Sequence, residues 1–160
     1  MSGASRPQIP DPPGSRRHSV RHSIDSFVAR RSAMELAREI GFDRLACVEI
    51  AIATSELAVN IAKYGVSGHV TLTAVHDPDR GPGIAIVASD RGPPFHDFEM
   101  ALRDGCDEEG PIDPGEILHR HGLGAGLGAV ARFTDELSWQ PTPDGKEVRA
   151  VRYMSHRPRD

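Results

Sequence analysis

The stretch DRGPGIAIVASDRGPPF, residues 79–95, places the same short phrase, DRGP, on both sides of an apolar run. This run, at 84–88, follows an alternating segment at 70–75, and together they predict two adjacent antiparallel strands. The first phrase falls between the strands, where Asp, Gly and Pro favour the geometry of a hairpin turn. The second phrase begins at Asp90, at the end of the second strand. It is either a further turn or an acid held against a ligand.

Upstream of these strands, apolar residues recur at helical spacing in two segments. The first helix is expected to begin at an N-cap, Asp25 or Ser26, and to end at Gly41. The second is expected to begin after the cap Asp43 and to end at Gly65. Its predicted core stripe consists of Leu45, Val48, Ala51, Ile52, Ser55 and Val59.

Downstream, the pattern predicts a short helix at 95–103 and a long lid at 105–121 that is rich in Gly, Pro and acidic residues. A helix opened by glycines follows, and closing strands are predicted at 137–140 and 147–154. A further short strand is expected at 17–23, before the first helix. This order predicts an α/β two-layer sandwich, with helices on one face of a mostly antiparallel sheet.

The 160 residues suit one domain, predicted at 17–155, preceded by a disordered tail at 1–16 that is rich in Pro, Ser and Gly. A net charge of −4, without a run of Lys or Arg, argues against a nucleic-acid partner. The two cysteines are far apart and predict reduced thiols. No signal peptide or membrane-spanning segment is expected, so we predict a cytoplasmic protein without a membrane partner.

Two motifs supply candidate acids. Glu56 and Asn60 share one face of the second helix, and Lys63 follows one turn later, although most such pairs are solvated surface. Asp90 ends a buried strand, with Gly92 after it, and a carboxylate in a partly dry place needs a hydrogen-bond donor. An adenine amino group and a backbone amide of the following turn are both candidates, and the motif alone favours the amide.

The third motif is a run of alternating glycines at 122–128. Glycines allow backbone N–H groups to approach a phosphate closely, and the helix that they open presents its positive end. The spacing matches neither the dinucleotide fingerprint nor the P-loop, and a flexible linker is the alternative. The candidate contact residues of this run are Gly122, Leu123, Gly124, Ala125, Gly126 and Leu127.

In this order, the three motifs resemble the GHKL ATPase superfamily from about residue 33 to residue 153. The chain looks most like the small serine/threonine kinases of bacterial partner-switching systems, the anti-sigma-factor and stressosome switch kinases. The matching segments are SELAVNIAKYG (55–65, N box), ASDRGPPF (88–95, first glycine box) and HGLGAGLGAVARFTDEL (121–137, second glycine box). The resemblance implies the Bergerat fold, and it assigns the second DRGP to the ligand box.

The resemblance also implies that these boxes bind ATP or ADP with Mg²⁺. Asn60 would complete the coordination of a Mg²⁺ held by the ATP phosphates, and Glu56 would accept or orient the proton of the attacking hydroxyl. Asp90 would read the adenine amino group, with Gly92 giving the backbone room. Lys63 is a further expected nucleotide contact, and the glycine run would fold over the phosphates.

The implied substrate is a serine or threonine on a STAS-domain antagonist protein, and the implied output is control of a sigma factor or a PP2C-type phosphatase. A homodimer is compatible with the resemblance. The alternative is a nucleotide-binding anti-sigma or stressosome module with little or no kinase activity. Pro94, the long lid, and Lys146, where relatives commonly have a threonine, favour that alternative. The ATP-binding domain of a histidine kinase is a weaker interpretation, because no helical hairpin with a phospho-acceptor His is evident.

Overall fold

A computed structural model of the chain describes residues 11–103, 106–107, 110–111 and 126–157. Its helices are α1 (Asp25–Ile40), α2 (Arg44–Tyr64), α3 (Phe98–Ala101) and α5 (Leu127–Phe133). Its strands are β1 (Arg16–Val20), β2 (Gly68–Asp77), β3 (Gly81–Asp90), β4 (Cys106–Asp107), β5 (Gly110–Pro111), β6 (Glu136–Thr142) and β7 (Gly145–Tyr153). Most of the predicted lid and most of the predicted tail lie outside the described residues.

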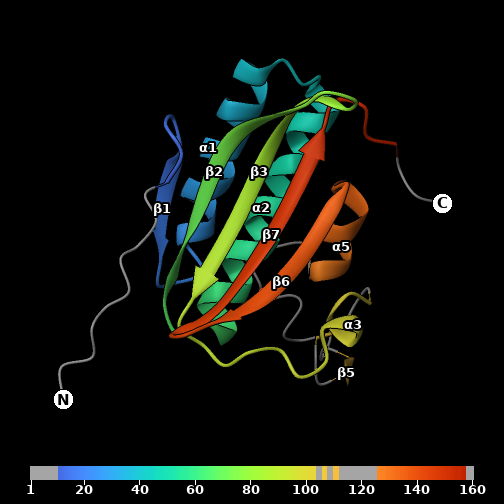
Figure 1. The fold of residues 1–160 in the computed structure, drawn as a ribbon. Coiled ribbons are helices and arrows are strands. Elements are labelled where there is room, and N and C mark those ends of the chain that lie inside the picture. The colour runs from blue at the N-terminus through green and yellow to red at the C-terminus, as the bar shows by residue number, and fades with distance from the viewer. Residues whose placement is uncertain (1–10, 104–105, 108–109, 112–125, 158–160) are drawn as a thin grey trace.

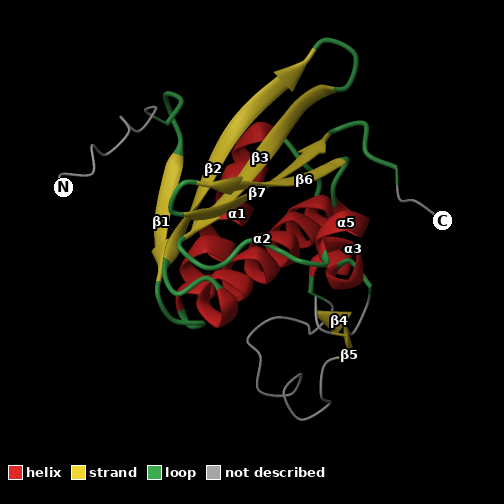
Figure 2. Ribbon diagram, turned by 60° about the horizontal axis from the view of Figure 1, so that its bottom comes forward, coloured by secondary structure: helices red, strands yellow, loops and turns green. Residues whose placement is uncertain are grey.

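The long strands form one sheet in the order β1-β2-β3-β7-β6, and each neighbouring pair in it is antiparallel. The helices α1, α2 and α5 lie on one face of this sheet (Figure 1). Figure 2 shows the same two layers from a second direction, with the helices beneath the strands. The predicted two-layer α/β sandwich is therefore confirmed, and its main sheet is wholly antiparallel.

The β2–β3 hairpin is closed by the first DRGP phrase. The Oδ1 atom of Asp77 accepts hydrogen bonds from the backbone N–H groups of Asp79 and Arg80, each at 2.9 Å. Gly81 follows with a φ of 79°, a left-handed value that favours glycine. An Asp side chain that bonds the backbone two residues on is common turn chemistry, and here the bonding acid is Asp77, two residues before the phrase. The first copy is therefore a hairpin turn, as predicted.

The helix ends follow the predictions with one exception. Asp43 is the N-cap of α2, and Gly41 ends α1 with a φ of 110°. At the start of α1, however, Asp25 Oδ2 accepts from the backbone N–H groups of Arg21 at 2.8 Å and His22 at 3.0 Å. Asp25 thus closes the turn that leads into the helix, and the prediction of a side-chain cap here was wrong.

The predicted core stripe of α2 was wrong in its first turn. Leu45 is 68% exposed and Val48 is 39% exposed. From Ile50 to Ile61, by contrast, almost every residue is buried, because the sheet, α1 and α5 all pack against this part of the helix. A helix that is buried on several sides has no single apolar stripe, so helical spacing alone selected the wrong positions.

By length and composition, α2 would also be able to cross a membrane. The expectation that no segment of the chain has this property was therefore wrong. Within the fold, 67% of the most apolar window of α2 is buried inside the protein. The apolar length of α2 is thus used to form the core beneath the sheet.

The short helix α3 is shorter than the helix predicted at 95–103. It begins after Asp97, whose Oδ1 accepts from the backbone N–H of Met100 at 2.9 Å. The preceding residues instead place the ring of Phe95 against Trp139 on β6, with ring centroids 5.1 Å apart. The segment after the second DRGP phrase is therefore mainly a loop that leads to the edge of the sheet.

Candidate active site

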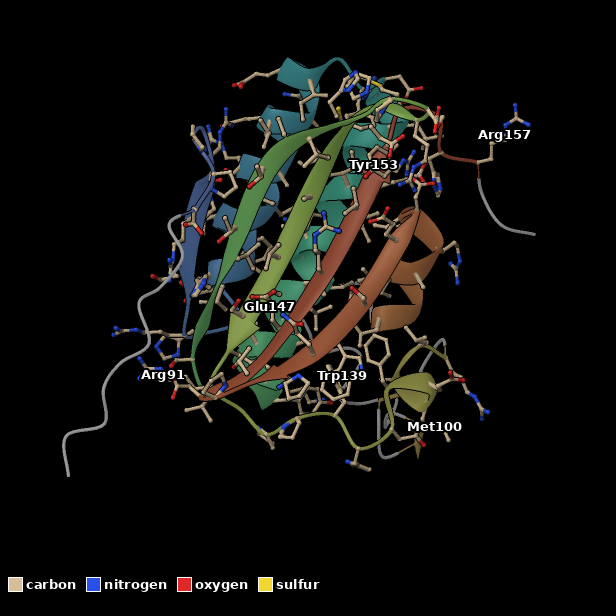
Figure 3. The ribbon with its side chains drawn as sticks, viewed as in Figure 1. Arg91, Met100, Trp139, Glu147, Tyr153 and Arg157 are labelled. Atoms are coloured by element: carbon tan, nitrogen blue, oxygen red, sulfur yellow. The ribbon has the colours of Figure 1, made fainter. Side chains whose placement is uncertain are left out.

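The end of α2 and the end of β3 are joined by backbone hydrogen bonds. The N–H of Arg91 donates to the carbonyl oxygens of Gly65 at 3.2 Å and Ser67 at 3.1 Å. Gly65 closes the predicted N box, and Arg91 follows Asp90 in the first glycine box. Arg91 and Trp139 both lie toward this end of the sheet (Figure 3). The fold therefore brings two of the three predicted motifs together.

The loop between α2 and β2 is strained at Val66. Its φ is 67°, and the Ser67 N–H donates to the Gly65 carbonyl at 2.8 Å across it, which closes a three-residue turn. A positive φ is uncommon for a β-branched residue and costs about 1–2 kcal/mol. Such strain persists only where the surroundings impose it, and here Arg91 bonds both flanking carbonyls. The junction of the two motifs is thus a strained element held from both sides.

Asp90 is enclosed by glycines from three segments of the chain. A Cβ atom at Gly65 would lie 2.6 Å from Asp90 Cγ. One at Gly92 would lie 2.5 Å from the carbonyl oxygen of Tyr64, and one at Gly145 would overlap the carbonyl oxygen of Asp90. Real Cβ atoms do not approach other atoms so closely. The glycines therefore allow the backbone of three segments to pack closely at Asp90.

The Asp90 carboxylate is held by two donors. The backbone N–H of Gly92 donates to Oδ1 at 2.8 Å, and Lys146 Nζ donates to the same oxygen at 3.0 Å. The side chains of Asp90 and Lys146 are only 5% and 6% exposed. Burial raises the pKa of Asp90, and the Lys146 ammonium and the Gly92 amide oppose that rise because they stabilise the charged form. The turn amide was one of the two expected donors, whereas Lys146 was not anticipated.

Glu56, Asn60 and Lys63 follow one another along α2, and their solvent exposure increases toward the C-terminus of the helix, which lies next to Asp90. Glu56 is fully buried at 0% exposure, Asn60 is half-buried and Lys63 is exposed. The ammonium of Lys63 lies 5.2 Å from the centroid of the Tyr64 ring. Burying a carboxylate in an otherwise apolar helix is costly. Glu56 is therefore not part of the solvated surface pair that the motif alone allowed.

Of the predicted contact residues in the glycine run, two lie within the described residues: Gly126, the N-cap of α5, and Leu127, its first residue. Gly126 has φ 60° and ψ −144°, a conformation that is essentially restricted to glycine. Leu127 is 2% exposed and belongs to the hydrophobic core, so any contact with a nucleotide would involve its backbone. The remaining predicted contacts, Gly122, Leu123, Gly124 and Ala125, lie outside the described residues.

An aromatic cluster beside Asp90 was missed by the sequence analysis. Phe95, Phe98 and Trp139 pack with centroid distances of 5.0, 5.1 and 6.1 Å, and Lys146 Nζ lies 5.3 Å from the Phe95 centroid. Lys146 itself was noted only as a departure from the family pattern. A signal for its role was present, because pairing the third and last long strands in antiparallel register places Lys146 opposite Asp90.

The residues present fit a magnesium ion that arrives with a nucleotide. Within the described ranges, no group of three His, Cys, Asp or Glu side chains is arranged to hold a metal ion. Asn60 offers one neutral amide oxygen. Mg²⁺ commonly takes one or two ligands from the protein and the remainder from substrate phosphates and water. A single protein ligand is therefore sufficient only when the phosphates are present.

Comparison with known proteins assigns this fold to a class of ATPase domain. The sequence pattern of the histidine kinase-like ATPase domain matches residues 25–152, from the first residue of α1 almost to the end of β7. The chain therefore belongs to the histidine kinase-like ATPase domain family.

Among the relatives, the serine/threonine-protein kinase RsbT of Bacillus subtilis (strain 168) is 34% identical over 132 residues, covering 81% of this chain and 90% of RsbT. The chain is accordingly a protein serine/threonine kinase, as the resemblance predicted. A chain in the crystal structure of the SiaB–SiaC complex from Pseudomonas aeruginosa is also similar. It has a TM-score of 0.47 and 16% identity, and the match covers 86% of this chain and 88% of that chain.

Proposed function

We propose that this kinase transfers the γ-phosphoryl group of Mg-ATP to a serine or threonine of a STAS-domain antagonist protein. The observation that carries the proposal is the junction of α2 with β3. The helix that carries the buried Glu56 ends against the loop that follows Asp90. Phosphorylation would add negative charge to the antagonist and change its partner, a sigma factor or a PP2C-type phosphatase, in the cytoplasm. The identities of these partners follow from the motif resemblance.

At the base end, Asp90 binds the adenine. Both hydrogen bonds that the described residues make to its carboxylate end on Oδ1, so Oδ2 can accept from the 6-amino group of the base. Gly92 supports this arrangement because its missing side chain lets the turn amide reach Oδ1. The base is thereby selected by an acceptor that the fold has already oriented.

At the phosphate end, Asn60 and Glu56 act from one face of α2. A bound Mg²⁺ neutralises charge on the phosphates, and Asn60 offers it an amide oxygen. Glu56 takes the proton of the attacking serine or threonine hydroxyl. The hydroxyl oxygen then bonds to the γ-phosphorus as the bond from that phosphorus to the β–γ bridging oxygen breaks, which releases ADP. Lys63 and the glycine run at 122–127 add positive charge and backbone donors around the phosphates.

Titration calorimetry with ADP and ATP, with and without Mg²⁺, tests the binding half of this proposal. We expect magnesium-enhanced binding that Asp90→Ala abolishes, and Asn60→Ala should remove the enhancement by magnesium. Asp79→Ala is the matched control, because it changes the equivalent acid of the first DRGP copy, in an exposed turn. Nucleotide binding that is unaffected by Asp90→Ala would contradict the site.

Phosphoryl transfer to purified STAS-domain proteins, followed by mass spectrometry of the acceptor, tests the catalytic half. Glu56→Gln should bind nucleotide normally and lose transfer by a factor of about 100 or more, which is the usual contribution of a general base. Glu35→Gln, on the exposed face of α1, is the control. Equal transfer by Glu56→Gln would contradict the role of Glu56, and nucleotide binding without transfer by the unmodified protein would favour the binding module.

A further inference from the structure

Lys146 and Asp90 form a buried ion pair between neighbouring strands. They stand directly opposite each other in the register of β3 and β7, so their side chains project from the same face. Lys146 alternates along β7 with Val148 and Ala150, which are 4% and 0% exposed and belong to the core beneath the sheet. The ammonium therefore points toward the helical layer, where the nucleotide site is proposed, and not toward the outer face.

This pair has hydrogen-bonding capacity that the described part of the chain does not use. An ammonium has three N–H donors, and one of them is accepted by Asp90 Oδ1 at 3.0 Å. The Lys146 side chain is 6% exposed, so bulk water has little access to the other two. On the partner, both hydrogen bonds end on Oδ1. A donor and an acceptor thus lie side by side, and a ligand that offers the complementary pair would gain charge-assisted hydrogen bonds.

The surroundings of the pair suit a flat heteroaromatic ring. The ring of Phe95 lies 5.3 Å from Lys146 Nζ, and Phe98 and Trp139 pack against Phe95. Each of these three side chains is half-buried, so the cluster is not closed off within the core. Aromatic faces favour stacking with bases, and a neighbouring cation adds to that attraction.

We propose that Lys146 reads the base together with Asp90, with Nζ donating to ring nitrogen N1 of adenine while Asp90 Oδ2 accepts from the 6-amino group. Adenine carries this acceptor and this donor next to each other on its Watson–Crick edge. Lys146 is then a specificity-determining residue, because it supplies a charged donor to the base. This inference rests on the proposed function, because it requires a nucleotide at Asp90.

Nucleotides that lack one ring nitrogen test the inference without altering the protein. Calorimetry would compare ADP with 1-deaza-ADP, which lacks the N1 acceptor, and with 7-deaza-ADP, which retains the whole edge. We expect 1-deaza-ADP to bind the unmodified protein about tenfold to a hundredfold more weakly than ADP, as for loss of a charge-assisted hydrogen bond. The affinity of 7-deaza-ADP should stay within about threefold of that of ADP, because N7 lies on the other side of the 6-amino group from N1 and is not part of the Watson–Crick edge.

The same comparison in two variants assigns the contact to Lys146. Lys146→Thr restores the residue type of the relatives and should bind ADP and 1-deaza-ADP within about threefold of each other, because a hydroxyl forms a weaker bond than an ammonium. Lys146→Arg keeps a charged donor and should retain the preference for ADP. Thermal unfolding of each variant verifies that it is folded. The comparison in the unmodified protein remains decisive even where a variant is unstable.

Two results would overturn the inference while leaving the proposed function intact. One is equal affinity of the unmodified protein for ADP and 1-deaza-ADP. The other is an unchanged preference in Lys146→Thr, which would mean that another group contacts N1. If ADP does not bind, or binds equally well to Asp90→Ala, the proposed nucleotide site is itself wrong and the inference falls with it.

Discussion

The two DRGP phrases lie at opposite ends of β3, and the fold uses the same four letters for opposite purposes. Figure 3 shows the contrast, with Tyr153 beside the hairpin end of the sheet and Arg91 at the other end. At the hairpin end, the arginine of the phrase, Arg80, forms hydrogen bonds with surface carboxylates. At the Asp90 end, the acid is buried and the arginine is exposed.

The hairpin end is an open network of surface charges. Arg80 lies 4.1 Å from the centroid of the Tyr153 ring and donates to Glu136 at 2.7 Å and to Asp77 at 3.3 Å. Its side chain is 39% exposed, so solvent screens these interactions. Nothing lies within 4 Å of a Cβ atom built on Gly81. Arg80, Asp77 and Glu136 thus already have charged partners within the protein.

The Asp90 end is dry and formed largely by the backbone. Gly92 packs against the end of α2, and Asp90 pairs with Lys146 away from water. Identical local sequence therefore does not decide the role of either copy. The role depends on what the fold brings to it, which is surface side chains in one case and the end of a core helix with a buried lysine in the other.

Removing the buried lysine at the Asp90 end should cause the largest change in the free energy of unfolding, and it tests the contrast between the two ends of β3. We expect Lys146→Met to reduce the free energy of unfolding by about 3–5 kcal/mol, because it leaves the Asp90 carboxylate buried without its counter-charge. Arg80→Met, at the hairpin end, should cost less than about 1 kcal/mol. Urea unfolding at neutral pH, followed by the fluorescence of Trp139, the one tryptophan, measures both.

A double variant separates the charge effect from lost packing. Adding Asp90→Asn to Lys146→Met removes the unpaired charge and should recover more than half of the lost stability. If Lys146→Met costs no more than Arg80→Met, then the buried pair is as weak as a surface pair and the proposed difference between the two ends disappears.

The two glycines offer the next largest effect. Gly92→Ala would place a Cβ atom 2.5 Å from a backbone oxygen and 2.7 Å from the Cα of Gly65, so the loop must shift, at a cost of about 1–3 kcal/mol. In Gly81→Ala the added Cβ atom would contact nothing within 4 Å. The only cost is the backbone strain of a φ of 79° for alanine, which is about 1 kcal/mol. Urea unfolding gives both values, and ADP titration should show lost binding only for Gly92→Ala. Lost binding in both variants would argue that the site is sensitive to stability and not to local geometry.

The parts of the fold that follow local rules were predictable from the sequence. The strand alternation, the cap at Asp43 and the glycine at Gly41 each depend on a few neighbouring residues, and each prediction is confirmed. The start of α1 was missed because Asp25 had two local options, a cap or a turn, and the chain entering from β1 selects the turn. Leu45 was misplaced because the extent of α1 and α5 over α2 is a tertiary property.

The site shows the same division. Asp90 and Glu56 could be proposed from the sequence because each lies in a recognisable motif on a predictable element. Lys146 was missed as a partner because it lies 56 residues from Asp90, and only the strand order brings the two together. The role of a residue that acts through a distant neighbour cannot be inferred from its own local sequence. Pairing between predicted strands is therefore the additional information that the sequence analysis needed.

The smallest expected effect is a difference in pH dependence between the two ends of the hairpin. Burial raises the pKa of Asp90, so its folded form binds the proton more tightly than its unfolded form. Its contribution to stability is therefore complete below the unfolded pKa and is lost as the pH rises through the folded pKa. Backbone N–H groups of Arg80 and Asp79 lower the pKa of Asp77. Its contribution is present above the unfolded pKa and is lost as the pH falls through the folded pKa.

Urea unfolding between about pH 2.5 and pH 6 measures these opposite slopes of stability against pH. Above the unfolded pKa of 3.8, Asp90→Asn should remove a decline of stability with rising pH. Below a pH of 3.8, Asp77→Asn should remove an increase of stability with rising pH. If the two substitutions remove slopes of the same sign from the curve of stability against pH, the contrast is wrong, because the two carboxylates would then experience the same kind of environment. Opposite signs would show that the first copy of the phrase rests on a hydrogen-bonded surface acid, and the second on an acid that the fold keeps dry at a cost to its own stability.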